Sequence, residues 1–222
     1  MIVSTMTKDE VLREIRRDYV WVLERTDGIR IKYNKVIKSV KANRTLGIVN
    51  YTTPNRNKVT VVWRVIVYGK GLIDIACSMY FHNMTPKGLQ FLMPLNSCTE
   101  LLVYTSHCID RMQERGSMSF GDYIRYVEET ENKCGITRYK YDGKETQLMS
   151  VGSNGAFIVV HGDWGITAVT FIGNDQFGEN QSKVASDLLS EVHGYVEQVR
   201  KDVYDNFMNM NRKDRRNYSF AS

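Results

Sequence analysis

The chain has 222 residues, of which 42% are hydrophobic and 25% charged, a balance that excludes a disordered polypeptide. Its first residues, MIVSTMTKDE, lack the pattern of a signal peptide, and no apolar run approaches the ~20 residues that cross a bilayer. We therefore expect a cytoplasmic protein without a membrane partner. The four cysteines show no CxxC spacing, so we predict neither a metal site nor another cofactor.

Basic residues are concentrated in the first third of the chain. Residues 1–70 hold 15 Lys and Arg against 6 Asp and Glu, whereas residues 71–222 hold 15 against 19. This asymmetry favours an anionic partner such as RNA for the N-terminal region, with a merely solvated basic surface as the alternative. Six side chains are candidates for RNA contacts, namely Arg13, Arg16, Arg17, Lys35, Lys38 and Lys41.

The first predicted element is a helix that begins after Thr7. The stretch TKDE has the form of a capping box, with Thr7 as N-cap and Glu10 three residues later. Apolar residues then recur at helical spacing until Gly28, which predicts the helix end, and residues 29–46 fit either a strand or a helix. Four β-branched and aromatic runs follow and predict an antiparallel meander, at 59–68, 72–81, 88–95 and 99–105.

A short helix over 107–115 is predicted next, with Ser106 as N-cap and Gly116 as its stop. A further helix is expected from Ser119. Four short apolar runs separated by glycine-containing turns then predict a second antiparallel sheet, at 135–141, 145–151, 155–162 and 165–173.

The C-terminal segment 181–212 is predicted to form one long helix, because apolar residues recur there every three or four positions. At ~1.5 Å per residue such a helix spans roughly 45 Å, which is too long for a small sheet. We therefore expect it to contact a protein partner or a second copy of the chain. The elements together predict an α+β fold of antiparallel sheets with flanking helices, divided into the units 1–105, 106–177 and 178–222.

The predicted helix after Ser106 carries a cluster of titratable side chains. On a helical wheel, one face collects His107, Arg111, Glu114 and Arg115, and the apolar side collects Cys108, Ile109 and Met112. Two interpretations stay open at this point. The cluster is either the solvated face of an ordinary charged helix or one wall of an active site.

Metal-independent RNA cleavage is the chemistry that suits this cluster. His107, in the first helical turn, is favoured as a neutral base, and the guanidinium groups of Arg111 and Arg115 fit a phosphate. Glu114 would orient an arginine, and His161 at the end of a later strand is the candidate acid. Purified protein should then cleave RNA in the presence of EDTA, and a His107→Ala/Arg111→Ala variant should not.

The motif SHCIDRMQERG, followed by glycine-punctuated strands ending in ITAVTFIG, resembles a family of bacterial and mobile-element domains. That family is similar to RelE-like and BrnT-like ribonuclease toxins of the barnase type. The resemblance covers about residues 105–177. It implies a helix–helix–four-stranded antiparallel sheet and catalytic roles for His107, Arg111, Arg115 and Thr170. The alternative is a non-catalytic phage or mobile-element assembly protein that associates through its long C-terminal helix.

Overall fold

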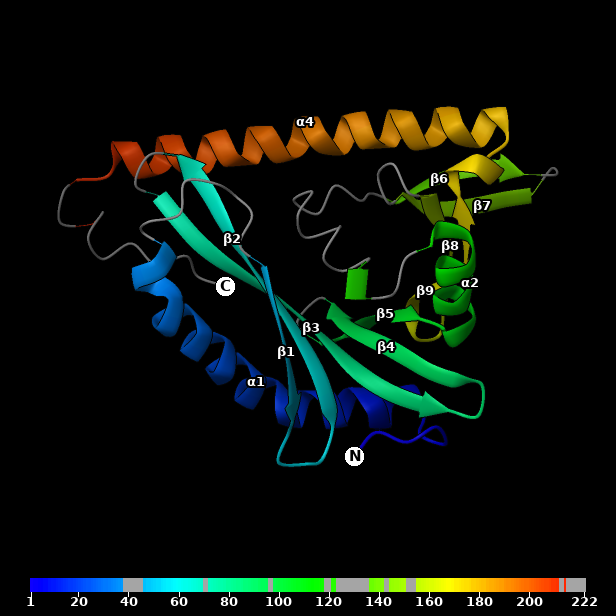
Figure 1. Ribbon diagram of the computed structural model, residues 1–222, viewed down its shortest axis with the longest axis horizontal. Coiled ribbons are helices and arrows are strands. Elements are labelled where there is room, and N and C mark those ends of the chain that lie inside the picture. The colour runs from blue at the N-terminus through cyan, green and yellow to red at the C-terminus, as the bar shows by residue number, and fades with distance from the viewer. Residues whose placement is uncertain are drawn as a thin grey trace.

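The computed structural model describes residues 1–37, 46–69, 72–95, 98–117, 121–122, 136–141, 144–150, 155–211 and 214. Within this part of the chain, helices pack on both faces of one large twisted sheet (Figure 1). In chain order the elements are α1 (Lys8–Ile37), β1 (Leu46–Thr52), β2 (Lys58–Gly69), β3 (Leu72–Thr85), β4 (Gly88–Leu95), β5 (Glu100–Tyr104), α2 (Ser106–Gly116), β6 (Ile136–Tyr141), β7 (Lys144–Ser150), β8 (Gly155–Gly162), β9 (Gly165–Gly173), the 3-10 turn η1 (Asn174–Gln176) and α4 (Glu179–Asn209).

The sheet has nine strands in the order β1-β2-β3-β4-β5-β9-β8-β7-β6. Strands β1 to β5 form one antiparallel meander and β6 to β9 form another. The two meanders meet where β5 and β9 pair in parallel, with Leu101 opposite Gly165 and Tyr104 opposite Ala168. This pairing continues the sheet across the expected unit boundary at residue 105.

The expected RelE- and barnase-like architecture is therefore wrong. Strands β6 to β9 do lie in antiparallel order, but they are part of a nine-stranded mixed sheet and do not form a separate four-stranded one. The physical reason is that β9 would otherwise present an open edge, and the apolar strand β5 fills it. The helix expected from Ser119 lies outside the described residues except for positions 121–122.

Helix α1 begins as the capping box predicts. The Thr7 N–H donates to Glu10 Oε2 at 2.8 Å, and the Glu10 N–H donates to Thr7 Oγ1 at 3.4 Å. The predicted end at Gly28 is wrong, because α1 continues to Ile37. Ile29 is buried in the core cluster beneath the helix, and this packing outweighs the low helix propensity of a glycine.

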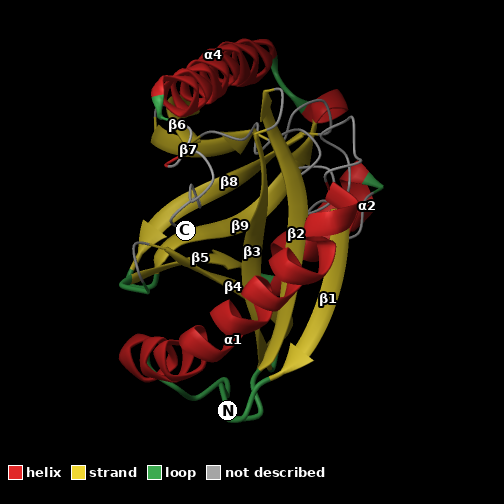
Figure 2. Cartoon of the chain, turned by 90° about the vertical axis from the view of Figure 1, so that its left-hand side faces the viewer, coloured by secondary structure: helices red, strands yellow, loops and turns green. Residues whose placement is uncertain are grey.

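Alternate residues of β2 face opposite sides of the sheet, as the two-residue period of a strand requires. The side chains from Val59 to Val65 at odd-numbered positions pack against α1, whereas Val62 packs on the other face with Tyr80 and Tyr104. Figure 2 shows α1 crossing the first strands obliquely. Helix α1 thus covers one face of the N-terminal meander, and side chains on the other face, such as Tyr104, pack against Cys108 and Met112 of α2.

Helix α4 lies along the top of the molecule in Figure 1, from β6 and β7 to the end of β2. Its first three turns bury Gln181, Ala185 and Leu188, and Ala185 packs on Ala156 of β8. An external partner was expected for α4 because a small sheet could not support a helix of this length. Nine strands are wide enough to support α4 at both ends, so its length alone no longer requires a partner. No helix among the described residues is both long and apolar enough to cross a membrane.

Candidate functional site

Helix α2 has the two-sided character expected from its sequence. Cys108 and Met112 are fully buried against β9, and His107 is exposed. The helix begins one residue earlier than predicted, because the Cys108 N–H donates to Thr105 Oγ1 at 3.2 Å and makes Thr105 the N-cap. It ends at Gly116, and the C-cap residue Ser117 adopts the left-handed conformation with φ of 49°. Burial raises the pKa of Cys108 to about 12, which removes this thiol as a nucleophile.

Three charged side chains of α2, namely Arg111, Glu114 and Arg115, have partners within the chain. Arg111 Nη1 lies 2.7 Å from Glu114 Oε2, in a pair whose side chains are 39% and 59% exposed. Arg115 Nη1 donates to the Phe171 carbonyl oxygen at 2.9 Å. The three residues therefore serve the surface and the packing of α2 on β9. These contacts do not aim the two guanidinium groups at a shared ligand position.

Thr170 does not face α2. Its neighbour Phe171 packs with Met112, and adjacent residues of a strand point to opposite faces. Thr170 pairs directly with Ile158, which packs beside Ala185 of α4. The predicted convergence of Thr170 with the helix cluster is therefore absent.

His161 is exposed and pairs with Ile166 near the β8–β9 turn. No contact among the described residues joins it to His107. The role of His161 as an acid stays a prediction without a geometric basis, and so does the role of His107 as a base.

Two of the basic residues on α1 form contacts within the fold. Arg16 Nε donates to the Cys98 carbonyl oxygen at 3.1 Å, and Arg17 Nη1 pairs with Glu14 at 2.7 Å. Arg13 is exposed. The side chain of Lys35, like Lys38 and Lys41, lies outside what the structure describes. The RNA contacts expected of these residues stay predictions.

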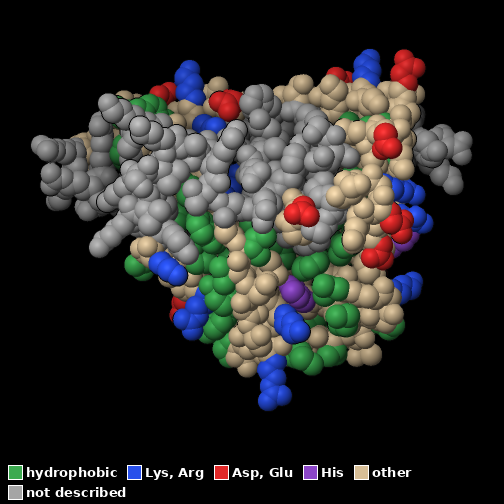
Figure 3. All heavy atoms as spheres, in the orientation of Figure 1, with side chains coloured by type: hydrophobic (Ala, Val, Ile, Leu, Met, Phe, Trp, Pro, Cys, Tyr) green, Lys and Arg blue, Asp and Glu red, His purple; other side chains and the backbone are tan. Residues whose placement is uncertain are grey.

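A pocket of about 450 Å³ lies at the end of the N-terminal meander and was missed by the sequence analysis. It is lined by residues 1–4 and 56–58 together with His82, Met84 and Leu89. This volume falls within the roughly 300–1,000 Å³ of small-molecule sites. In Figure 3 hydrophobic side chains gather over the lower half of one face, interspersed with basic ones and a histidine. The contributing segments are distant in sequence, so no local motif indicates the pocket.

The pocket combines an apolar wall with cationic groups. Ile2, Val3, Met84 and Leu89 supply apolar surface. Arg56 and Lys58 are exposed at its margin, and neither belongs to an ion pair in the described part of the chain. Arg56 has φ of 62°, so the tight β1–β2 turn fixes its backbone in the left-handed region. The charge and the apolar surface thus meet in one cavity.

His82 contributes a polar group whose tautomer follows from its neighbours. Its Nε2 lies 2.8 Å from Thr60 Oγ1, and that hydroxyl donates its only proton to Asn50 Oδ1 at 2.7 Å. Thr60 must therefore accept from His82, which places the imidazole proton on Nε2. Nδ1 is left as an acceptor and has no partner among the described residues. The edge of Phe91 packs against the ring with centroids 4.9 Å apart.

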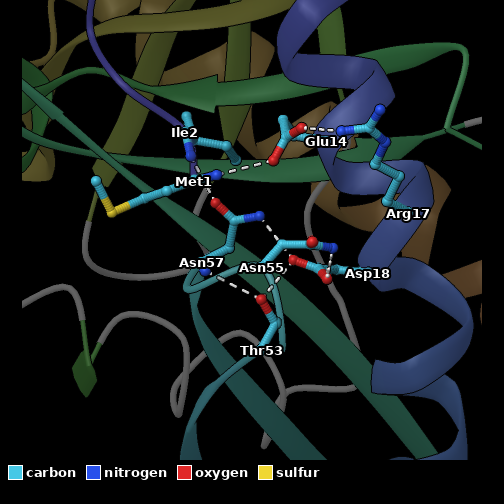
Figure 4. A network of polar contacts seen from close by, with 8 residues as sticks. All are labelled: Met1, Ile2, Glu14, Arg17, Asp18, Thr53, Asn55 and Asn57. Atoms are coloured by element: carbon cyan, nitrogen blue, oxygen red, sulfur yellow. Dashed lines mark hydrogen bonds and ion pairs between the residues drawn. The ribbon is translucent and has the colours of Figure 1, made fainter.

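A buried carboxylate holds the turn that lines the pocket (Figure 4). Asp18 of α1 is 1% exposed and accepts hydrogen bonds from the side chains of Thr53, Asn55 and Asn57, the two amide contacts measuring 2.7 and 2.6 Å. Asn57 Oδ1 in turn accepts from the Ile2 N–H at 2.6 Å. The first residues of the chain are therefore positioned over the pocket through Asn57, and Asn57 is positioned by Asp18.

Replacing His82 by glutamine should weaken the pH dependence of stability. Burial first, and then the charge of Lys58, lower the pKa of His82 below its ordinary 6.5. The unfolded chain binds the proton more readily, so the stability from neutral His82 is complete above pH 6.5 and is lost as the pH falls through the lower folded-state value. Urea unfolding at pH 5, 6 and 7 measures this slope.

The exposed His161→Gln variant controls for the loss of an imidazole elsewhere on the sheet. We expect the wild type and His161→Gln to lose stability between pH 7 and pH 5 more steeply than His82→Gln. An unchanged slope in His82→Gln would show that the folded protein protonates this ring as readily as the unfolded chain does.

No group of His, Cys, Asp and Glu side chains suited to a metal ion occurs within the described ranges. No family model, curated protein or solved structure matches the chain.

Proposed function

We propose that the protein is a non-catalytic binding protein that takes a small anionic amphiphile, a carboxylate on an apolar chain or ring, into the pocket beside His82. The observation that carries the proposal is that Arg56 and Lys58 flank the same cavity of about 450 Å³ whose wall is formed by Ile2, Met84 and Leu89. We also propose that the protein is located in the cytoplasm.

The cationic side of the pocket supports recognition of the ligand's charge. A carboxylate about 4 Å from a cation gains about 1 kcal/mol in water and about 4 kcal/mol at the effective dielectric constant of a protein surface. The guanidinium of Arg56 also offers paired donors that match the two carboxylate oxygens. Because both cations are exposed, we expect this contribution to fall as the salt concentration rises.

The apolar wall supports affinity for the rest of the ligand. Burial of apolar surface contributes roughly 25 cal/mol per Å², and this contribution does not depend on salt. Nδ1 of neutral His82 adds an acceptor that favours a ligand with a hydroxyl or amide donor. Exposed cations, an apolar wall and one hydrogen-bond acceptor are groups suited to binding, which is why we propose binding and no reaction.

The earlier hypotheses have less support than the pocket. RNA cleavage by α2 stays a prediction, because Arg111 and Arg115 have partners within the fold. Association through α4 also stays a prediction. Tyr195 is 70% exposed there, but the helix is supported by the sheet at both ends.

Octanoate should bind the full chain saturably, and 1-octanol and inorganic phosphate should bind at least about tenfold more weakly, a difference of 1.4 kcal/mol. The reason is that each control ligand lacks one half of the recognised chemistry. The double variant Arg56→Asn/Lys58→Gln should weaken octanoate binding by about tenfold, and Met84→Glu should weaken it by placing a like charge on the wall. Isothermal titration calorimetry measures all of these affinities.

Asparagine is chosen at position 56 because it tolerates the left-handed backbone. Lys87→Gln is the matched control, since Lys87 is an exposed cation in the β3–β4 turn that does not line the pocket. Equal affinity for octanoate and 1-octanol, or an undiminished affinity in the double variant, would refute the proposal. Circular dichroism of each variant checks that the fold is intact.

A further inference from the structure

Strand β1 forms one end of the nine-stranded sheet, and β6 forms the other. One side of β1 pairs with β2 over seven consecutive residues, from Leu46 to Thr52, without a bulge. No described strand pairs with its other side. The outward N–H and C=O groups of a regular edge strand form a template for another strand.

The two ends of the sheet differ in how they are protected. Proteins commonly protect an edge with charged residues, proline, a bulge or a very short strand. The sequence of β6, ITRYKY, contains Arg138 and Lys140. The sequence of β1, LGIVNYT, contains no charged residue and no proline, and Ile48 is 37% exposed. An edge without these features is suited to strand addition.

We propose that β1 pairs in antiparallel fashion with β1 of a second copy of this chain, so that one sheet continues through both molecules. A two-fold axis at Val49 places Ile48 opposite Asn50 and sets the two Val49 side chains beside each other. This register brings a β-branched pair together and places no like charges opposite each other. With a second copy as the partner, one interface pairs the outward backbone N–H and C=O groups of β1 in both molecules.

The face alternation of β1 is compatible with this pairing. Val49 and Tyr51 pack on the side of α1, and the edge of Tyr51 contacts Trp21 at a centroid distance of 6.0 Å. Ile48, Asn50 and Thr52 point to the other face and are exposed. In the dimer Ile48 would be shielded by its neighbour across the two-fold axis, which accounts for an apolar residue at this position.

Light scattering of the full chain should give twice the mass of the monomer and show a concentration-dependent return to monomer on dilution. Ile48→Lys should give the monomer mass throughout, because it places two lysines at the centre of the shared ladder. Val160→Lys is the matched control, since Val160 is 44% exposed on the interior strand β8 and should leave the dimer intact. Hydrogen exchange should show β1 amides more protected at high concentration than at low concentration.

A wild-type chain that is monomeric at every concentration would overturn the proposal. So would a dimer that survives Ile48→Lys and is dissociated by Tyr195→Lys, which would locate the interface on α4. The octanoate titration is independent of this outcome, because the pocket residues and the outer edge of β1 are different groups.

Discussion

Replacing Gly165 by alanine should destabilise the protein by on the order of 3 kcal/mol, more than most single substitutions. Gly165 has φ of 110°, a conformation that side chains with a Cβ rarely adopt. An added Cβ would lie 2.5 Å from the Leu101 carbonyl oxygen and 3.0 Å from its nitrogen. The substitution therefore combines backbone strain with a clash at the parallel β5–β9 pairing that joins the two meanders. Urea unfolding at neutral pH measures the loss.

Gly162 is the matched control, because it closes the same β8–β9 turn. A Cβ there would meet nothing within 4 Å, and the residue does not have a positive φ. Gly162→Ala should change the free energy of unfolding by no more than about 0.5 kcal/mol. Comparable losses in the two variants would mean that the turn, and not the close approach to β5, determines the effect.

Replacing Asp18 by alanine should also cost on the order of 3 kcal/mol, because three side-chain donors would lose their acceptor in a buried site. Thr53 and Asn57, which belong to that set, are themselves buried. The same change should weaken octanoate binding, since Asn57 would no longer hold Ile2 over the pocket. Urea unfolding and calorimetry measure the two effects.

Asn55→Ala provides the graded comparison for Asp18→Ala. Asn55 is exposed and gives Asp18 one of its three side-chain hydrogen bonds, so its removal should cost about 1 kcal/mol and leave octanoate binding unchanged. If Asp18→Ala lowered the free energy of unfolding no more than Asn55→Ala does, water would be accepting the hydrogen bonds in place of the lost carboxylate. The network would then not be what positions the pocket.

Features of the fold that depend on local sequence were predictable. The capping box at Thr7 and Glu10 involves residues three apart, and the amphipathic character of α2 depends only on helical period. The hairpin of β2 and β3 followed from β-branched runs around a glycine turn. Strand β1 was not singled out, because LGIVNYT follows a segment whose pattern fits two structures.

Features that depend on long-range pairing were not predictable. Nothing near Leu101 indicates that it pairs with Gly165, so two sheets were expected where the structure has one. The face of Thr170 depends on a register shift between Ile158 and Val159, which a strand pattern does not reveal. The pocket combines three segments, and the asparagine-rich turn TTPNRN was the one local signal that could have directed attention to it.

The parallel pairing of β5 with β9 can form only late in synthesis, because the two strands are far apart in the sequence. Leu101 to Tyr104 are four consecutive buried residues, and their neighbour on one side is β9, more than sixty positions further along the chain. During synthesis the first meander can pair all its own strands while β5 still has an apolar open edge. Ribosome-bound chains that stop before residue 165 should therefore be the species most prone to aggregate or to recruit chaperones.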